Sequence, residues 1–226
     1  MWEEGIEAIN INAFDNNNSV VVQWSKFDDT TNSKLYIDNQ TMYNGNQTGY
    51  VYNNFLNSNG IHTMTVTQNH PIYGSISSKP LSGAYIKIGD INYDNEVSSI
   101  DFAYLKKQLL NENTLTALQK VAADLNEDGS VNSIDFAILK VYLLNSSSNC
   151  DIGGIRYILF GDVNFDGKID SQDISVIQNA LSDTSVLTVK QFAAADVDGD
   201  GKVTQNDISC INNYMVSDNY KFPVAN

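Results

Sequence analysis

GDINYDNEVSSIDFAYLKKQLL at residues 89–110 and ADLNEDGSVNSIDFAILKVYLL at residues 123–144 align with each other, with their first aspartates 34 residues apart. The same pattern returns in GDVNFDGKIDSQDISVIQNAL at residues 161–181 and ADVDGDGKVTQNDISCINNYM at residues 195–215, again offset by 34 residues. Each copy is a loop rich in Asp, Asn and Gly that leads into a segment with apolar residues three or four positions apart, which is typical of an amphipathic helix. Self-similarity at a fixed period indicates repeated structural units. We therefore predict four loop–helix units arranged as two pairs.

The four loops (loop 1, 90–101; loop 2, 124–135; loop 3, 162–173; loop 4, 196–207) space their oxygen atoms like EF-hand calcium loops. Such a loop uses side chains at positions 1, 3, 5 and 12, the backbone carbonyl at position 7, and often a water held by position 9. A hard cation needs six or more oxygens, so the pattern predicts four Ca²⁺ sites. The predicted ligands are Asp90, Asn92, Asp94, Glu96, Ser98 and Asp101 in loop 1; Asp124, Asn126, Asp128, Ser130, Asn132 and Asp135 in loop 2; Asp162, Asn164, Asp166, Lys168, Asp170 and Asp173 in loop 3; and Asp196, Asp198, Asp200, Lys202, Thr204 and Asp207 in loop 4, with Glu96, Ser130, Lys168 and Lys202 acting through their carbonyls.

Two loop positions refine this prediction. Position 6 needs a sharp turn with positive φ, which Gly129, Gly167 and Gly201 allow without steric cost, and loop 1 has the next most tolerant residue, Asn95. Position 12 is Asp in all four loops, where sensors of the calmodulin type have Glu. Clusters of Asp, Asn and Gly also form ordinary turns, but four matches in register favour calcium loops.

The composition agrees with metal binding and argues against other partners. The formal charge is −14, and the four loops hold 16 of the 27 acidic residues. No run of Lys or Arg suggests binding to nucleic acid or to an anionic membrane, no apolar run is long enough to cross a bilayer, and the first residues do not resemble a signal peptide. Cys150 and Cys210 are expected to be two small buried residues, although a bridge between them is possible.

Residues 1–82 have a different pattern, in which short runs of Val, Ile, Thr and Tyr alternate with turn signals. Six or seven such strands predict an antiparallel β-sandwich. The strand candidates are IEAININAF, SVVVQWSK, SKLYIDNQTMY, GYVYNNFL, GIHTMTVTQ and YGSISS. With Trp24, Tyr36 and the HTMTVTQ strand in this order, the region resembles a fibronectin type III or immunoglobulin-like domain, except that His62 opens the strand where a Tyr is expected.

From about residue 86 to 218, the chain resembles two copies of the dockerin module of bacterial cellulosomes, because each loop ends in Asp and runs directly into a helix without an entering helix. The resemblance implies a multidomain β + α protein: the N-terminal sandwich (1–82), a first dockerin (86–146), a polar, fairly flexible linker (147–154) and a second dockerin (155–220). It also implies that cohesin modules of a scaffoldin bind the helix surfaces, and that the protein is secreted, attached to the cell surface through a cellulosome, and monomeric when unbound.

In dockerins, loop positions 10 and 11 and exposed residues of the following helix select the cohesin. On this resemblance the partner-binding residues are Ser99, Ile100, Lys106, Lys107, Ser133, Ile134 and Lys140 in the first module and Ser171, Gln172, Gln205 and Asn206 in the second. The near-identity of the two first-module helices implies binding in two orientations, and the polar residues of the second module imply a different cohesin or an unequal affinity. The helix residues expected in the core are Phe102, Leu105, Leu109, Phe136, Leu139 and Leu143; the three lysines could equally be solvated charges.

Three other functions fit the sequence less well. Dockerins accompany hydrolases, but the β region is short and neither His62 nor His70 lies in a catalytic motif, so we expect the non-catalytic end of a larger protein. Alternatively, the sandwich could bind carbohydrate through Trp2, Tyr43, Tyr50 or Tyr52, although aromatic residues in strands are usually cross-strand partners. A calcium buffer or sensor is disfavoured by the expected lack of an entering helix and of a Met-rich groove.

Overall fold

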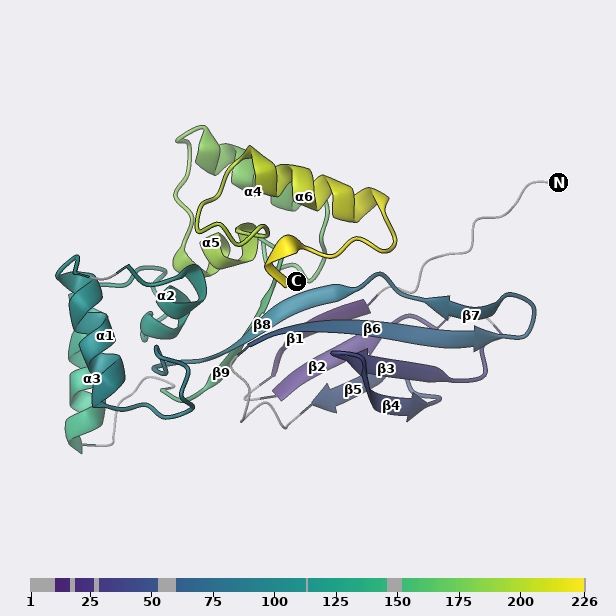
Figure 1. Ribbon diagram of the computed structural model, residues 1–226, viewed down its shortest axis with the longest axis horizontal. Coiled ribbons are helices and arrows are strands. Elements are labelled where there is room, and N and C mark those ends of the chain that lie inside the picture. Colours follow the sequence, from purple (N-terminus) through teal and green to yellow (C-terminus); the bar gives the residue numbers. More distant parts are fainter. Residues whose placement is uncertain are drawn as a thin grey trace.

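The computed structural model describes residues 11–16, 19–26, 29–52, 60–112, 114–145 and 152–225. It places an N-terminal β-sandwich beside two helical modules (Figure 1). The antiparallel sandwich and the two helical calcium-loop modules predicted from the sequence are confirmed. Among the described residues, no helix is both long and apolar enough to span a bilayer.

The sandwich consists of two antiparallel sheets packed face to face. One has the strand order β1-β2-β5, and the other has the order β4-β3-β6-β8-β9 with β7 paired to β6. Val20, Val22 and Trp24 of β2 pack against apolar residues of the second sheet such as Leu35 and Met64. The strands are β1 Ile11–Asn16, β2 Ser19–Trp24, β3 Ser33–Ile37, β4 Gln40–Gly45, β5 Gly49–Tyr52, β6 Gly60–His70, β7 Gly74–Ser77, β8 Leu81–Lys87 and β9 Ile155–Leu159.

One predicted strand is a hairpin. SKLYIDNQTMY divides into β3 and β4, which pair antiparallel with Ile37 opposite Gln40. Asp38 and Asn39 form the two-residue turn, with φ values of 50° and 65°. Two consecutive positive φ values match the right-handed twist of the flanking strands, and Asn and Asp tolerate this conformation better than most residues.

The predicted linker, residues 147–154, ends in a contact with the first module. Its last residues, Gly153 and Gly154, exchange backbone hydrogen bonds with Ile88 at 2.7 and 2.8 Å. The chain then continues directly into β9, which pairs antiparallel with β8 and so extends the sandwich sheet. Residues 146–151, with Cys150, lie outside the described residues. The domain boundaries themselves stay predictions.

Each helical module consists of two longer helices and one short helix. The six helices are α1 Ser99–Leu109, α2 Ala117–Ala123 and α3 Ser133–Asn145 in the first module and α4 Ser171–Leu181, α5 Val189–Ala195 and α6 Gln205–Val216 in the second, and a 3₁₀ turn, η2, covers Pro223–Ala225. The short helices α2 and α5 lead directly into loops 2 and 4. The expectation that no helix enters the loops is therefore wrong for these two, because Thr116 and Thr188 each form a capping box that starts a helix.

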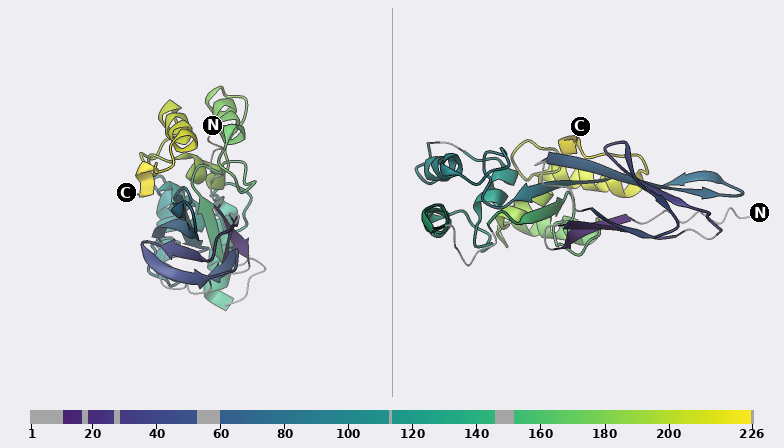
Figure 2. Two further views of the ribbon diagram at one scale, coloured as in Figure 1. Left: turned by 90° about the vertical axis from the view of Figure 1, so that its right-hand side faces the viewer. Right: turned by 90° about the horizontal axis from the view of Figure 1, so that it is seen from below.

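Five of the six expected helix core residues lie in the core as predicted, whereas Leu109 is half-buried and lies outside the core cluster. Leu105 and Leu139 are fully buried, and the rings of Phe102 and Phe136 stack with their centroids 4.3 Å apart. Figure 2 shows α1 and α3 side by side at the end of the molecule away from β7, while α4 and α6 form a second pair. The two pairs of long helices thus lie on different sides of the molecule.

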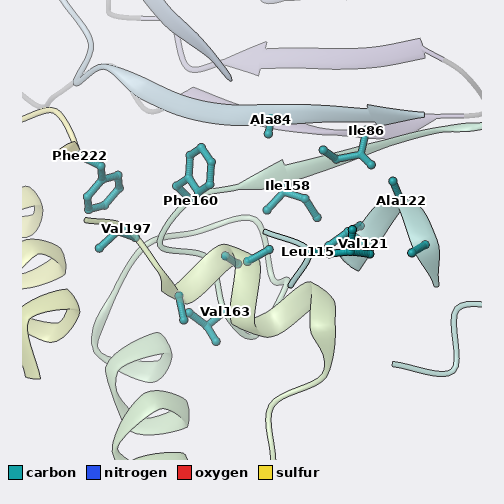
Figure 3. Packing of buried hydrophobic residues seen from close by; sticks show 14 of the residues in the cluster. Ala84, Ile86, Leu115, Val121, Ala122, Ile158, Phe160, Val163, Val197 and Phe222 are labelled. Atoms are coloured by element: carbon teal, nitrogen blue, oxygen red, sulfur yellow. The ribbon is translucent and has the colours of Figure 1, made fainter. Parts of the chain in front are cut away.

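A single hydrophobic core joins the two modules. It contains Ile86 of β8 and Val121 of α2 from the first half, together with Ile158 of β9, Val163 and Val197 from the second (Figure 3). Phe222, which follows α6, is 1% exposed and closes this core. The modules are therefore packed units of one body.

Candidate calcium loops and partner faces

The aspartate at position 12 braces each loop from within. Asp101 Oδ1 accepts hydrogen bonds from the amides of Ile91 and Asn92 at 2.7 and 3.1 Å, and its Oδ2 accepts from the Ser98 amide at 2.8 Å. The equivalent residues Asp135, Asp173 and Asp207 make the same three contacts. All four are fully buried. The short Asp side chain thus serves the loop backbone and the helix start together.

The aspartate at position 1 lies opposite, and it is also buried. Asp90 Oδ2 accepts from the Asn95 amide at 2.9 Å, and Asp124, Asp162 and Asp196 accept from position 6 in the same way. Position 6 has positive φ in every loop, as predicted. Position 4 also has positive φ in every loop, which the spacing of the ligands does not predict: Tyr93, Glu127, Phe165 and Gly199 have φ between 56° and 75°.

These donor sets fit a calcium ion. In loop 4, carboxylate oxygens of Asp196, Asp198 and Asp207 lie within 4.8 Å of one another. Asp196 Oδ1 is buried and has no hydrogen-bond partner among the described residues, which is costly unless a cation binds it. The donors are oxygens alone, the set that Ca²⁺ prefers. The predicted ligands would hold the ion, which would supply the positive charge that the crowded carboxylates require.

The electrostatics of the bare loops agree with this fit. Burial and, to a smaller extent, the facing position-12 carboxylates raise the pKa of Asp124, Asp162 and Asp196 to about 6. Burial also raises the pKa of Asp135, Asp173 and Asp207 above its usual value. Removing a carboxylate from water disfavours its charged form, and so does a nearby like charge. A bound cation reverses both effects.

Position 9 connects each loop to the helix that follows it. Ser98 accepts a hydrogen bond from the Ile100 amide at 3.2 Å, and Asn132 accepts from the Ile134 amide at 2.7 Å. Asp170 and Thr204 cap α4 and α6 in the same manner. Because the position-9 residue is the N-cap, positions 10 and 11 fall in the first exposed turn of the helix.

The predicted partner residues of the first module are all exposed, on the helices α1 and α3. We call the exposed side of α1 and α3 the first face. Ile100 and Ile134 are 52% and 53% exposed there, beside Ser99, Ser133 and the exposed Lys106, Lys107 and Lys140. Leu110, Val141 and Leu144 are also exposed at this end of the module. The first face is therefore apolar with a basic component.

The second face, which is the exposed side of α4 and α6, has a different chemistry. The predicted residues Ser171, Gln172, Gln205 and Asn206 are exposed in the first turns of the two helices. Both helices are described in full, and none of their exposed side chains is charged. The second face therefore offers hydroxyl and amide groups.

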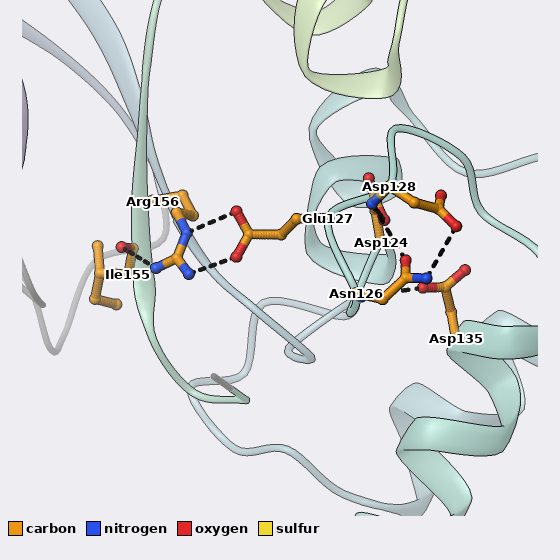
Figure 4. A network of polar contacts seen from close by, with 7 residues as sticks. All are labelled: Asp124, Asn126, Glu127, Asp128, Asp135, Ile155 and Arg156. Carbon is orange, nitrogen blue, oxygen red and sulfur yellow. Dashed lines mark hydrogen bonds and ion pairs between the residues drawn. The ribbon is translucent and has the colours of Figure 1, made fainter. Parts of the chain in front are cut away.

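Loop 2 contacts the second module through hydrogen bonds that the loop pattern does not predict. Arg156 of β9 donates two hydrogen bonds to the Glu127 carboxylate, at 2.5 and 3.1 Å (Figure 4). These bonds hold the pKa of Glu127 below its usual value. The Val189 amide at the start of α5 donates to the Gly129 carbonyl at 3.0 Å. No local signal marks these pairs, because each joins residues from different modules.

The sandwich contacts the second module through Lys79. Its ammonium group donates to the carbonyls of Tyr214 and Met215 at the end of α6, at 3.1 and 2.8 Å. A cation near the last carbonyls of a helix interacts favourably with the helix dipole. The residues after α6 pack back on the same module, where Phe222 stacks on Tyr214 with ring centroids 5.0 Å apart.

Tyr43 and Tyr50, the two described residues among those considered for carbohydrate binding, do not form an open platform. Tyr43 lies between Trp24 and Tyr50, with ring centroids 5.8 and 6.0 Å apart, and both tyrosines are partly buried against the sandwich core. Trp2 and the side chain of Tyr52 lie outside the described residues. His62 contacts Asp38 at 2.5 Å, which fits a structural role.

Comparison with known proteins identifies both modules. A family model described as the dockerin type I domain matches residues 88–144 and 160–216. No curated protein matches the chain. Two solved structures resemble parts of it: pectate lyase Pel3 from Pectobacterium carotovorum, at 11% identity over 34% of this chain and 26% of that chain with a TM-score of 0.31, and the spore cortex lytic enzyme SleM from Clostridium perfringens, at 16% identity over 30% and 24% with a TM-score of 0.26. The chain spans about a quarter of these structures, and scores this low support no conclusion about fold or function.

Proposed function

Because the chain belongs to the dockerin type I family through residues 88–144 and 160–216, we propose that it attaches its parent protein to a cellulosome scaffoldin by calcium-dependent binding of cohesin modules. Dockerin modules bind calcium and cohesins, and they are non-catalytic interaction modules. We further propose that all four loops bind Ca²⁺, that the protein is secreted, and that it is monomeric when unbound.

One observation carries this proposal: every loop couples its ligands to an exposed helix start. The buried position-12 Asp and the capping residue at position 9 hold the loop and the first helical turn together, as Asp101 and Ser98 do in loop 1. Calcium binding and presentation of positions 10 and 11 therefore depend on the same backbone. Chelation should remove both.

Isothermal titration of the full chain with purified type I cohesins, in excess calcium and in EDTA, tests the proposal. We expect binding in calcium and none in EDTA, with restoration when calcium is added again. Asp101→Asn combined with Asp135→Asn should abolish binding at the first module. Ser130→Ala is the control, because position 7 contributes only its backbone carbonyl. Equal binding in EDTA and in calcium would overturn the proposal. So would the absence of binding to any of the cohesins tested.

A further inference from the structure

The internal repeat extends further towards the N-terminus than the calcium loops. AYIKIGD at residues 84–90 corresponds to RYILFGD at residues 156–162, offset by 72 residues. These segments hold β8 and β9, which pair antiparallel with Tyr85 directly opposite Tyr157. Tyr85 and Tyr157 are themselves equivalent in the repeat, and their ring centroids lie 4.9 Å apart. A pseudo-twofold axis relating the two modules therefore passes through this pair.

The rest of the contact between the modules follows the same symmetry. The equivalent helices α2 and α5 pack on each other near the axis. Loop 2 lies in a recess with Thr188 and Val189 of the second module, while loop 4 lies in a recess with the equivalent Thr116 and Ala117 of the first. The same surface is used on both modules, as in the interface of a twofold dimer.

This interface leaves both faces free. In the described part of the chain, the modules meet through β8, β9, the short helices and the second loop of each module, and not through the exposed sides of the long helices. Gly153 and Gly154 hold the end of the connection against Ile88. The two faces therefore have a fixed relative orientation, which the pairs α1/α3 and α4/α6 display in Figure 1.

The chemistry of the two faces suits two different partners. The first face combines three exposed lysines with exposed Ile100 and Ile134, in a chain whose formal charge is −14. It is complementary to an apolar patch bordered by carboxylates. The second face has no exposed charge on its helices. It is complementary to an uncharged surface that can pair its amides and hydroxyls, because unpaired polar groups are costly in an interface.

We propose that this chain is a rigid two-site connector, which holds two partner modules at once in a fixed geometry, with a carboxylate-bordered partner on the first face and an uncharged one on the second. The inference rests on the proposed cohesin binding, and adds to it the simultaneous occupancy, the rigidity and the division of partners by charge.

Native mass spectrometry and light scattering of the full chain with a panel of purified cohesins in calcium test simultaneous occupancy. We expect complexes with two cohesins on one chain. Ile100→Asp with Ile134→Asp should leave one cohesin bound, and so should Gln172→Arg with Asn206→Arg. All four substituted positions are exposed, so the variants should fold like the wild type. A melting temperature in calcium equal to that of the wild type would verify this. If each double variant still binds one cohesin but the wild type never binds two, the connector is overturned while cohesin binding stands. If no cohesin binds, the proposed function falls, and the connector with it.

The salt dependence of the binding affinity distinguishes the two faces. Binding by the Gln172→Arg, Asn206→Arg variant, which retains only the first face, should weaken about tenfold between 0.05 and 0.5 M NaCl, because surface charge pairs are screened. The Ile100→Asp, Ile134→Asp variant retains only the second face, which has no exposed charge on its helices. Its affinity should therefore change less than about twofold over the same salt range. Equal salt dependence of the two variants would overturn the division by charge.

Spin labels on the two faces, at Ala103 and Ser175, test the rigidity by pulsed electron resonance, with Cys150 and Cys210 replaced by Ser. We expect one narrow distance distribution. Gly129→Ala should broaden it, because the new methyl group would lie 2.7 Å from Thr188 Cγ2. Gly167→Ala is the matched control, because it has the same loop position and a similar φ, but no atom of the described residues lies within 4 Å of the added methyl group. A broad distance distribution in the labelled chain without either glycine substitution would overturn the rigid connector.

Discussion

The two modules share the geometry of their loops but differ in almost everything around it. The backbone contacts of Asp101 recur at Asp135, Asp173 and Asp207, with lengths that agree within a few tenths of an ångström. The outer helix faces have diverged, since Ile100 and Ile134 of the first face correspond to Gln172 and Asn206 of the second. The buried loop interior is constrained by ligation and by its hydrogen bonds, whereas the exposed turn beside it is free to vary.

The two second loops are also held by different contacts. Glu127 at position 4 of loop 2 pairs with Arg156. The equivalent residue of loop 4 is Gly199, against which Val224 of the C-terminal segment packs. The Val224 amide donates to the Val197 carbonyl at 3.1 Å. Thus an ion pair supports one loop and an apolar tail supports the other, so the modules should respond differently to substitution.

Calcium removal should have the largest effect and should not distinguish the modules. The bare loops crowd buried carboxylates, and saturating calcium at 100 times Kd adds about 2.7 kcal/mol per independent site. We expect EDTA to remove most of the helical circular dichroism. Hydrogen exchange should show α1, α3, α4 and α6 losing protection together, because the modules share a core. Protection that persists in one module alone would show that the core does not couple them.

Phe222→Ala should affect the second module most. Phe222 is 1% exposed and stacks on Tyr214, and removing a buried aromatic ring typically costs about 3–5 kcal/mol. Urea denaturation in calcium measures the free energy of unfolding. Val216→Ala is the control, because Val216 at the end of α6 is 84% exposed and should change stability by less than about 0.5 kcal/mol. A loss below about 1 kcal/mol for Phe222→Ala would mean that the tail does not support this module.

Acidification should weaken calcium binding wherever the position-1 carboxylate has a raised pKa. Asp124 in the first module and Asp162 and Asp196 in the second have pKa values of about 6. Calcium must displace their protons, so the affinity of each loop should fall about tenfold from pH 7 to pH 5. Calorimetric calcium titrations at the two pH values measure this, and unchanged affinity would contradict it.

Without calcium, the pH dependence has the opposite sign. The folded protein holds these three protons more tightly than the unfolded chain does, where the carboxyl pKa is close to its ordinary value of 3.8. The resulting stabilisation is fully present below about pH 4 and is lost as the pH rises through about 6. In EDTA, circular dichroism should therefore show more helix at pH 4 than at pH 7. Equal or lower helix content at pH 4 would contradict this.

Arg156→Met should have the smallest effect, confined to the contact between loop 2 and β9. Glu127 is about half exposed, so the bidentate pair should contribute only about 1 kcal/mol. Lys168→Met, an exposed change in loop 3, should alter stability by less than about 0.5 kcal/mol. Thermal melts in low and high salt measure both. A wild-type advantage over Arg156→Met that does not shrink in salt would indicate that Arg156 acts through packing.

Local patterns in the sequence predicted the loops and the long helices well. The calcium loop is a pattern of twelve consecutive residues, and its ligands, its glycine at position 6 and its N-cap all lie within reach of one another. The alternating apolar residues of the sandwich predicted most of its strands for the same reason. The hairpin turn at Asp38 and Asn39 was missed because the strand pattern continues through it. The short helices were missed because seven residues such as 117–123 carry little periodicity.

The sequence by itself therefore determined the calcium chemistry, the helices that follow each loop, and the difference in polarity between Ile100 and Gln172. Only the tertiary structure decided how the modules are joined. The copies AYIKIGD and RYILFGD are visible in the sequence, but nothing local states that Tyr85 and Tyr157 pair. That pairing brings together strands separated by the whole first module, and its stability comes from the shared core. Ligand spacing acts over a few bonds, whereas the choice of a strand partner depends on which distant surfaces can be buried together.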